Sequence, residues 1–378
     1  MDLPSGITIT RVEAATLKGT RPRVVGCNAR LPTHGRFTHD PVVRVYTDVG
    51  LFGWGWSRAT PDEARSLIGL ALDEVFTPPD GTRDDLFSFD LPLWDLAARA
   101  LGQPVFRLLG GTEARPVPAY DGSIYIDDID PETRADRGIA PIMDAVEAGL
   151  EFGFRAFKVK VGRGYRWMEP AAGLARDVEV LHAIRDRIGR EAILMIDGNN
   201  GYTPESAREV MRLAGDCGIH WFEEPFPEGT EECVAFRRHL RDEGRRTLLA
   251  DGEGSEKGDE AFTAIVRAGG VDVVQFDMRF YGMTRWKRYL ATIEETATLA
   301  APHNWGSHLS RFYIAQFALA CPRFAMVEVD RQMMPGVDDS GYGWADGAIT
   351  VPEAPGFGLA LDEDVWQGLL QGEGAWAV

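Results

Sequence analysis

The chain has 378 residues, of which 44% are hydrophobic and 26% charged, the composition of a soluble globular protein large enough for a barrel and a smaller second domain. Its formal net charge of −18 argues against nucleic acid or an anionic membrane as a partner, because the long-range field would repel both. A small anionic substrate is compatible with this charge, since a bound divalent cation dominates the field around it.

Cysteine usage and hydropathy indicate a cytoplasmic protein. The first residues, MDLPSGITIT, lack a basic region followed by an apolar run, so we expect no signal peptide. We also expect no membrane span, because no apolar run is long enough to cross a bilayer. The four cysteines lack CxxC spacing and are expected to be free thiols in a reducing compartment: Cys27, Cys217, Cys233 and Cys321.

The first part of the chain, residues 1–118, predicts a small α+β capping domain. Strands are expected over residues 7–17 and 41–58, with a turn at 48–50 in the second stretch. Residues 19–40 are rich in Arg, His, Pro and Gly and are interpreted as a mobile loop. Helical patterns follow over 62–76 and 89–111. The tail, residues 345–378, has strand and turn character and is expected to pack back on this domain.

Residues 119–344 predict a modified (β/α)7β barrel of the TIM type. Short apolar runs end in ionisable residues and alternate with helical patterns. The unit repeats about every 25 residues, the length of one strand, one helix and two loops. The first barrel strand is expected at VPAYDGS, residues 117–123. In such a barrel the carboxyl ends of the strands meet at one mouth, and buried charges there are best explained by a shared site. The ionisable residues at the strand ends are Lys158, Lys160, Asp197, Glu223, Glu253, Asp277, His303 and Glu328.

Lys158 and Lys160 lie two residues apart in an apolar strand, so their side chains are expected on one face. A solvent-facing pair on an edge strand is the alternative. The favoured interpretation is a base with a cationic neighbour, because close ammonium groups lower each other's pKa and allow one to be neutral near pH 7.

Asp197, Glu223 and Glu253 end three successive strands. Three carboxylates without a nearby Cys or His suit a hard cation, so the pattern predicts one Mg²⁺. Asp251 would share a face with Glu253, which leaves the third position open between them. Glu224 is expected to point away from Glu223.

Asp277 and His303 end adjacent strands, and a carboxylate that accepts a hydrogen bond from a histidine ring raises its basicity. A structural histidine is the alternative, and His308 is a weaker candidate for the same role. Glu328, at the last strand end, is interpreted either as a protonated acid that binds a substrate carboxylate or as a strand-end salt bridge.

Together the motifs KVK, DGN, FEEP, DGE, PH and VE resemble the enolase superfamily, and more narrowly its mandelate racemase subgroup. The resemblance covers nearly the whole chain, including the segment LPLWDLAARALGQPVFRLLGG and the tail motif PGFGLALDE. One departure is Gly122 followed by Ser123, where the subgroup often places Ser at the first strand.

The resemblance implies Mg²⁺-dependent removal of the α-proton of a carboxylate through an enediolate. Asp197, Glu223 and Glu253 match the metal ligands. Lys160 matches the base on one face of the substrate, with Lys158 as its cationic neighbour. His303, paired with Asp277, matches the acid/base on the other face, and Glu328 matches the group that stabilises the substrate carboxylate. Expected substrate contacts are Asn199, Asn304, Trp305, Ser123, His34 and Trp56.

Three reactions fit bases on both faces: dehydration of a sugar acid to a 2-keto-3-deoxy acid, racemisation or epimerisation, and cycloisomerisation of a lactone. Dehydration is favoured, because histidine can protonate a departing hydroxyl. A barrel that binds a sugar acid without turnover is the alternative of another class. A homo-oligomer, from dimer to octamer, is expected, with a small-molecule carboxylate as the partner.

Overall fold

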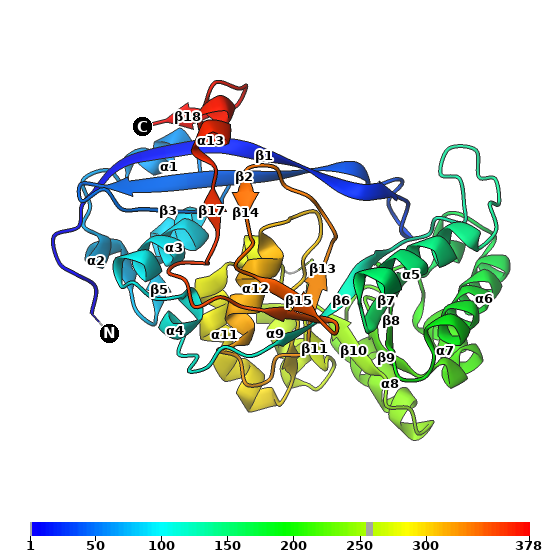
Figure 1. Cartoon of the computed structure of the whole chain (residues 1–378). Helices are drawn as coiled ribbons and strands as arrows, with labels where there is room; N and C mark the ends of the chain where they lie inside the picture. The colour runs from blue at the N-terminus through cyan, green and yellow to red at the C-terminus, as the bar shows by residue number, and fades with distance from the viewer. Residues whose placement is uncertain (1, 255–259) are drawn as a thin grey trace.

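The computed structural model describes residues 2–254 and 260–378, which form a long antiparallel sheet beside a barrel (Figure 1). Three strands follow one another in the sheet: β1 (Ile9–Val25), β2 (Gly35–Thr47) and β3 (Phe52–Trp56). At the other edge β18 (Trp376–Ala377) pairs with β1, so the two ends of the chain share one sheet.

The prediction of a mobile loop over residues 19–40 is wrong for most of that segment. β1 and β2 continue as a hairpin, with Gly19 opposite Thr38 and Thr20 opposite Phe37, and Thr20 also bridges to Met333. Backbone pairing on both sides of Thr20 therefore orders the segment despite its Pro and Gly content. The turn of this hairpin spans residues 26–34.

Helices of the first region pack beneath this sheet. The stretch predicted as one helix over residues 62–76 contains two short ones, because the chain turns at Gly69, where φ is +86°. A capping box between Thr60 and Glu63 begins the first. The elements are α1 (Pro61–Arg65), α2 (Leu72–Val75), β4 (Phe76–Thr77), β5 (Gly81–Thr82), η1 (Asp84–Phe89), α3 (Asp90–Ala100) and α4 (Val105–Leu108).

The barrel strands are parallel and adjacent in chain order. The last pairs with the first, Glu328 opposite Tyr120. Closure on the remaining side comes from a parallel bridge between Ala300 and Phe324, beside a hydrogen bond from the Ala325 N–H to the Ala300 carbonyl (2.9 Å). The strands are β6 (Val117–Ile124), β7 (Ala156–Lys160), β8 (Ile193–Asp197), β9 (Ile219–Glu223), β10 (Leu248–Asp251), β11 (Val273–Val274), β12 (Leu299–Ala300) and β13 (Val327–Val329).

Each strand up to β12 is followed by helix, which confirms the predicted (β/α)7β order. The helices are α5 (Ala140–Phe152), α6 (Pro170–Ile188), α7 (Pro204–Leu213), α8 (Thr230–Asp242), α9 (Glu260–Arg267), α10 (Met278–Tyr281) with α11 (Met283–Thr296), and α12 (Ser310–Ala318). Two 3₁₀ turns, η2 (Arg163–Tyr165) and η3 (Gly215–Cys217), lie in the connections. In the described residues no helix is long and apolar enough to cross a membrane.

The tail contacts both parts of the molecule. β15 (Gly343–Ala345) and β16 (Ala348–Thr350) form a hairpin that adds to β6 of the barrel. β14 (Val337–Asp338) pairs with β17 (Ala360–Leu361). Beyond these, α13 (Glu363–Leu370) packs on β1 of the long sheet (Figure 1).

The interior of the barrel is filled by its own apolar cluster, with residues drawn from every strand or its immediate flank. This packed layer closes the barrel below the strand ends, so polar chemistry is confined to the mouth, the carboxyl ends of the strands. Its members are Tyr120, Ala156, Met195, Trp221, Ala250, Val273, Ala301 and Met326.

Candidate active site

The two lysines of β7 lie on one buried face, as their spacing predicts. Lys158 and Lys160 are 1% and 5% exposed. β7 lies between β6 and β8, which excludes the edge-strand alternative. The Lys158 ammonium lies 2.6 Å from Glu223 Oε1, 2.7 Å from Glu328 Oε1 and 3.6 Å from Asp197 Oδ2. Lys160 forms an ion pair with Asp197.

Repulsion from Lys158 does lower the pKa of Lys160, but the expectation that one of the two lysines has a pKa low enough to be neutral near pH 7 is wrong. Burial lowers the pKa of Lys158, but Glu223 and Glu328 outweigh it and hold that pKa well above its usual value. The pKa of Lys160 is raised as well, because Asp197 outweighs both burial and the repulsion of Lys158. These carboxylates lie on other strands, so the sequence of β7 alone does not predict the pKa values of its lysines.

The three proposed metal ligands lie at the ends of β8 and β9 and just beyond β10. Asp197 Oδ1 accepts the backbone N–H of Asn199 (2.8 Å), and Glu223 Oε2 accepts Nε2–H of Gln275 (2.7 Å). Glu253 Oε2 lies 3.0 Å from His303 Nε2. Among the described residues, these three carboxylates do not form a group of ligand atoms within 4.8 Å of one another. Lysine and histidine side chains lie between them instead.

The chemistry of this set nonetheless fits a divalent cation. All three groups offer carboxylate oxygens, the ligands that Mg²⁺ prefers. Burial and the neighbouring carboxylates raise the pKa of Glu223 to about 8, although Lys158 opposes the shift. Negative charge is therefore in excess at the mouth, and a cation held by Asp197, Glu223 and Glu253 would relieve it.

Asp277 and His303 are joined as predicted. His303 Nδ1 lies 2.9 Å from Asp277 Oδ2, which leaves Nε2 directed toward Glu253. Arg279 also holds Asp277, with Nε 3.1 Å from Oδ1 and Nη2 2.7 Å from Oδ2, the oxygen that faces His303. Burial lowers the pKa of His303, but Glu253 and Asp277 outweigh it and hold that pKa well above its usual value. These contacts fix the orientation of the ring and favour its protonated form.

Glu328 adopts the salt-bridge alternative. Its Oε1 lies 2.7 Å from the Lys158 ammonium, and its Oε2 accepts the backbone N–H of Asn304 (2.9 Å). The Asn304 side chain is completely buried and donates to the Glu328 carbonyl (3.2 Å). This places Asn304 behind Glu328 as a positioning residue.

Ser123 is not brought to the mouth. A Cβ on Gly122 would lie 2.5 Å from Glu328 Oε1, so it is Gly122 that faces the mouth. Because side chains alternate along a strand, Ser123 points the opposite way and its hydroxyl bonds Asp121.

The remaining predicted contacts form two groups. His34, from the hairpin turn, packs edge-on against Tyr125 (4.7 Å between ring centroids) and Trp305 (5.4 Å). Lys160 lies 5.3 Å from the centre of the Tyr125 ring, so these aromatics form a wall beside the proposed base. Burial lowers the pKa of His34 to about 4. Trp56 is not part of this wall, and its ring packs against Phe280 (5.1 Å between ring centroids).

Backbone turns redirect two neighbouring acids. Glu224 has φ of +40°, so strand alternation fails there, and its side chain stays buried, 3.4 Å from Asn199 Nδ2. Burial, with Glu253 and Asp251, raises the pKa of Glu224 well above its usual value. The chain also turns at Gly252 (φ +126°), so that Glu253 reaches His303, whereas Asp251 accepts its hydrogen bond from the Gly252 N–H.

His308 lies outside this constellation. Its Nε2 is 3.0 Å from Asp339 of the tail, and its backbone N–H donates to Asp40. A role for His308 in the acid/base pair is therefore not supported.

Three residues of the site were missed in the sequence. Gln275, which holds Glu223, lies two residues before Asp277, and Arg279 lies two residues after it. The same i, i+2 rule that paired the lysines could have indicated Gln275. Tyr125 directly follows the end of β6, and no charge marked it.

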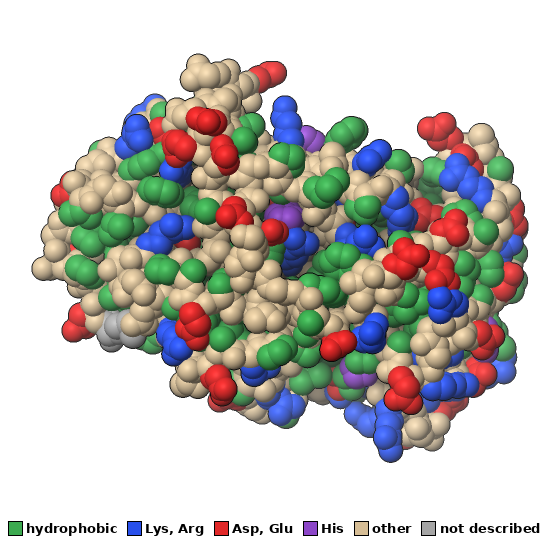
Figure 2. Space-filling model, viewed as in Figure 1, with side chains coloured by type: hydrophobic (Ala, Val, Ile, Leu, Met, Phe, Trp, Pro, Cys, Tyr) green, Lys and Arg blue, Asp and Glu red, His purple; other side chains and the backbone are tan. Residues whose placement is uncertain are grey.

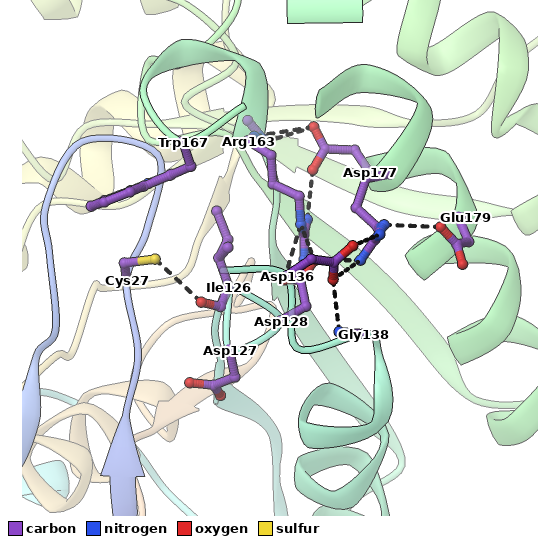
Figure 3. Close-up of polar contacts among 12 residues, drawn as sticks. Cys27, Ile126, Asp127, Asp128, Asp136, Gly138, Arg163, Trp167, Asp177 and Glu179 are labelled. Atoms are coloured by element: carbon purple, nitrogen blue, oxygen red, sulfur yellow. Dashed lines mark hydrogen bonds and ion pairs between the residues drawn. The ribbon is translucent and has the colours of Figure 1, made fainter. Parts of the chain in front are cut away.

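A second buried ionic cluster lies close to the mouth, where the hairpin turn meets the barrel (Figure 3). Arg163 is fully buried between Asp128 and Asp177, with Nη2 2.8 Å from Asp128 and Nη1 2.6 Å from Asp177. Nearby, Trp167 Nε1 donates to the Asn28 carbonyl (2.6 Å). The ion pairs join the loop after β7 to α6 and to the loop after β6, and the Trp167 hydrogen bond joins it to the capping hairpin.

Comparison with known proteins gives a family match and similarity to several named enzymes. Residues 142–365 match the family described as "Enolase C-terminal domain-like". A D-galactarolactone cycloisomerase of Agrobacterium fabrum is 30% identical over 299 residues, covering 74% of this chain and 72% of that protein. An arabinonate dehydratase of Saccharolobus solfataricus is 27% identical over 289 residues, covering 74% and 70%.

The solved structures extend the similarity over the whole chain. A galacturonate dehydratase from Geobacillus sp., complexed with D-galacturonate and 5-keto-4-deoxy-D-galacturonate, has a TM-score of 0.91 at 31% identity, covering 99% of this chain and 100% of that chain. A mandelate racemase/muconate lactonizing protein from a Geobacillus strain, complexed with magnesium/tartrate, has a TM-score of 0.92 at 30% identity, covering 100% and 98%.

Proposed function

The chain belongs to the enolase C-terminal domain-like family, and we propose that it is a Mg²⁺-dependent sugar-acid dehydratase. The observation that carries this proposal is the placement of two proton-handling side chains above three carboxylates. Lys160 extends from β7 and His303 follows β12. Four strands separate β7 from β12 on one side of the barrel, and β6 and β13 separate them on the other. The two groups therefore approach a bound acid from different walls.

The residues of the site have separate roles in this reaction. Lys160 exchanges a proton at the α-carbon, which requires that Asp197, the group that raises the pKa of Lys160, be engaged by the metal ion. Lys158 and Glu328 fix the neighbouring charge. His303 is held by Asp277 and its protonated form is favoured, so its Nε2 can donate to a departing β-hydroxyl. Mg²⁺, held by Asp197, Glu223 and Glu253, would supply Lewis-acid stabilisation of the enediolate. Loss of the α-proton and the β-hydroxyl releases water and gives an enol, which becomes the keto acid.

Hexuronic acids are the substrates to test first. The Geobacillus galacturonate dehydratase is similar over the whole chain, and the ligand named in its complex, 5-keto-4-deoxy-D-galacturonate, is what α-proton removal and β-hydroxyl loss would give. The polar and aromatic wall of His34, Tyr125 and Trp305 can contact sugar hydroxyls and ring faces.

The test is α-proton exchange in D₂O, followed by NMR over aldonic, aldaric and uronic acids with Mg²⁺. A keto product, trapped as its semicarbazone, is expected. Exchange without a keto product would favour a racemase. Conversion of a lactone would favour a cycloisomerase, the activity named for the Agrobacterium fabrum relative. Binding without exchange of any acid would leave a binding protein and contradict the proposal.

We further propose that the protein is cytoplasmic and forms a homo-oligomer. All four cysteines are free and buried, as in a reducing compartment. Phe37 pairs with Thr20 within the long hairpin, and Met333 pairs with Thr20 from a later segment of the chain. The two side chains are 72% and 61% exposed and form an apolar surface suited to binding a second copy. Acidic and basic side chains are interspersed over the face in Figure 2, without a continuous basic stripe for nucleic acid on that face. Phe37→Lys is expected to lower the mass of the protein in solution toward that of one chain. If the mass stays above that of one chain and equals that of the unaltered protein, the interface lies elsewhere.

A further inference from the structure

The amino-terminal end of the barrel carries a group of metal-ligating side chains that the proposed reaction does not use. His182 lies on α6, and Asp216 and Cys217 lie in η3, just before β9. One ligand atom from each of these residues lies within 4.8 Å of the others. Among the described residues, no other group of three such side chains meets this distance. β9 separates Cys217 from Glu223 by six residues, or about 20 Å of extended chain, so this group is far from the mouth.

The distance between the two strongest ligands matches a tetrahedral metal site. His182 Nδ1 lies 3.5 Å from Cys217 Sγ. A zinc ion binds imidazole nitrogen at about 2.0–2.1 Å and thiolate sulfur at about 2.3 Å, so at a tetrahedral angle the two ligand atoms are about 3.5 Å apart. The observed separation therefore needs little rearrangement to hold an ion.

The orientation of His182 is a second, independent observation. Its Nε2 is hydrogen-bonded to the Leu213 carbonyl (3.4 Å). A ring that donates Nε2–H to this carbonyl carries its free lone pair on Nδ1, which faces Cys217. Metal-binding histidines commonly have this second hydrogen bond, which fixes the tautomer.

Access to the group is open on one side. The side chains of His182 and Asp216 are 40% and 70% exposed, so the group is open to solvent on their side. An ion can therefore enter without unfolding the barrel, and water can complete its coordination.

We propose that His182, Asp216 and Cys217 form a second metal site, which takes a borderline divalent cation such as Zn²⁺ or Co²⁺ rather than Mg²⁺. Thiolate and imidazole ligands select such ions, whereas the all-carboxylate mouth favours Mg²⁺. On binding, the Cys217 S–H bond breaks, a metal–sulfur bond forms and the proton passes to the buffer. The ion would tie α6 to the connection between α7 and β9.

A nucleophilic Cys–His–Asp triad is the other chemistry these residues could perform. Burial raises the pKa of the Cys217 thiol to about 11, which leaves little thiolate to attack a substrate. The geometry therefore favours the metal site.

The test is a Co²⁺ titration of the full-length protein in excess Mg²⁺, which occupies the mouth. We expect a thiolate-to-cobalt charge-transfer band that saturates at one equivalent and is lost on addition of Zn²⁺. Cys217→Ser should remove the band, and His182→Gln should weaken Co²⁺ binding at least about tenfold. Cys321→Ser is the matched control, a buried cysteine outside the group that should keep the band.

Two outcomes would overturn the proposal: no charge-transfer band in the unaltered protein, or a band that persists in Cys217→Ser. Turnover of the sugar acid should be unchanged in Cys217→Ser, which shows that the variant is folded. If that variant fails to fold, unaltered Co²⁺ affinity in His182→Gln would overturn the proposal instead.

Discussion

Two buried ionic clusters of this molecule have similar burial and opposite character. In the Arg163 cluster (Figure 3) the guanidinium reaches both Asp128 and Asp177, and Asp177 also accepts the Tyr202 hydroxyl (2.6 Å). Opposite charges there are matched by geometry. At the mouth, by contrast, the single ammonium group of Lys158 is shared among the carboxylates of Asp197, Glu223 and Glu328.

Unused polar atoms mark the same difference. Around the mouth, the described side chains include buried atoms without a hydrogen-bond partner, namely Asn199 Oδ1, Gln275 Oε1, Asn304 Oδ1 and the Tyr120 hydroxyl. The three ion-paired side chains of the Arg163 cluster are not among such atoms. Because an unpaired buried polar group is costly, its presence at a strand-end mouth indicates a place for a ligand. Burial of charge alone therefore does not distinguish a site from a structural cluster, and the pairing of the neighbouring polar atoms has to be compared as well.

Of the changes considered, chelation of the metal ion should have the largest effect on the mouth and no effect on the Arg163 cluster. Treatment with EDTA is expected to lower turnover by at least about 10²–10³-fold, because the enediolate would lose its Lewis-acid partner. Re-addition of Mg²⁺ should restore the rate. EDTA should not change the contribution of the Arg163 cluster to the free energy of unfolding. Turnover that survives exhaustive chelation would mean that Asp197, Glu223 and Glu253 do not hold the catalytic metal.

Replacing either proton handler should be nearly as severe. Lys160→Ala and His303→Asn are each expected to lower kcat about 10²–10⁴-fold, the range of general acid–base catalysis. Deuterium exchange at the α-carbon, measured by NMR, separates them, since it should be lost only in the variant that lacks the base for that proton. Near-normal turnover in both variants would refute the assigned roles.

Breaking the structural cluster should affect stability instead of chemistry. Asp128→Asn removes one of the two carboxylates around Arg163 and should lower the free energy of unfolding by about 1–3 kcal/mol, because Nε and Nη2 lose their charged acceptor while Asp177 still pairs with Nη1. Urea denaturation measures this change. Asp136→Asn is the control, since Asp136 pairs with Arg176 at the surface and should contribute less than about 1 kcal/mol. A large loss of kcat in folded Asp128→Asn would place this cluster within the catalytic machinery.

Most of the mouth could be predicted because barrel periodicity fixes where strands end. Ionisable residues about every 25 positions indicated both the (β/α)7β fold and the convergence of Lys158, Asp197, Glu223 and Glu328. Alternation within one strand correctly placed Lys158 and Lys160 together.

What failed depended on contacts between distant strands or on single backbone turns. The raised pKa of Lys160 comes from Asp197 on another strand, which the lysine's own strand cannot reveal. A positive φ at Glu224 reverses the side expected from alternation. The ordering of residues 19–40 depends on pairing with Met333, more than 300 positions away. Ser123, however, faced the wrong side for a reason present in the sequence, since Gly122 occupies the inward position.

Gln275 gives the smallest and most specific test of the idea that the polar groups of the mouth are incompletely paired. Its Nε2–H is the side-chain amide donor to Glu223 Oε2, and it is 1% exposed. Gln275→Leu keeps the size but removes this hydrogen bond, so Mg²⁺ affinity should fall about 10–100-fold while saturating Mg²⁺ rescues kcat. Gln367→Leu, on exposed α13, is the matched control. Mg²⁺ affinity unchanged in Gln275→Leu would show that Glu223 is oriented by Lys158 alone, and the mouth would then resemble the Arg163 cluster more closely than its unpaired atoms indicate.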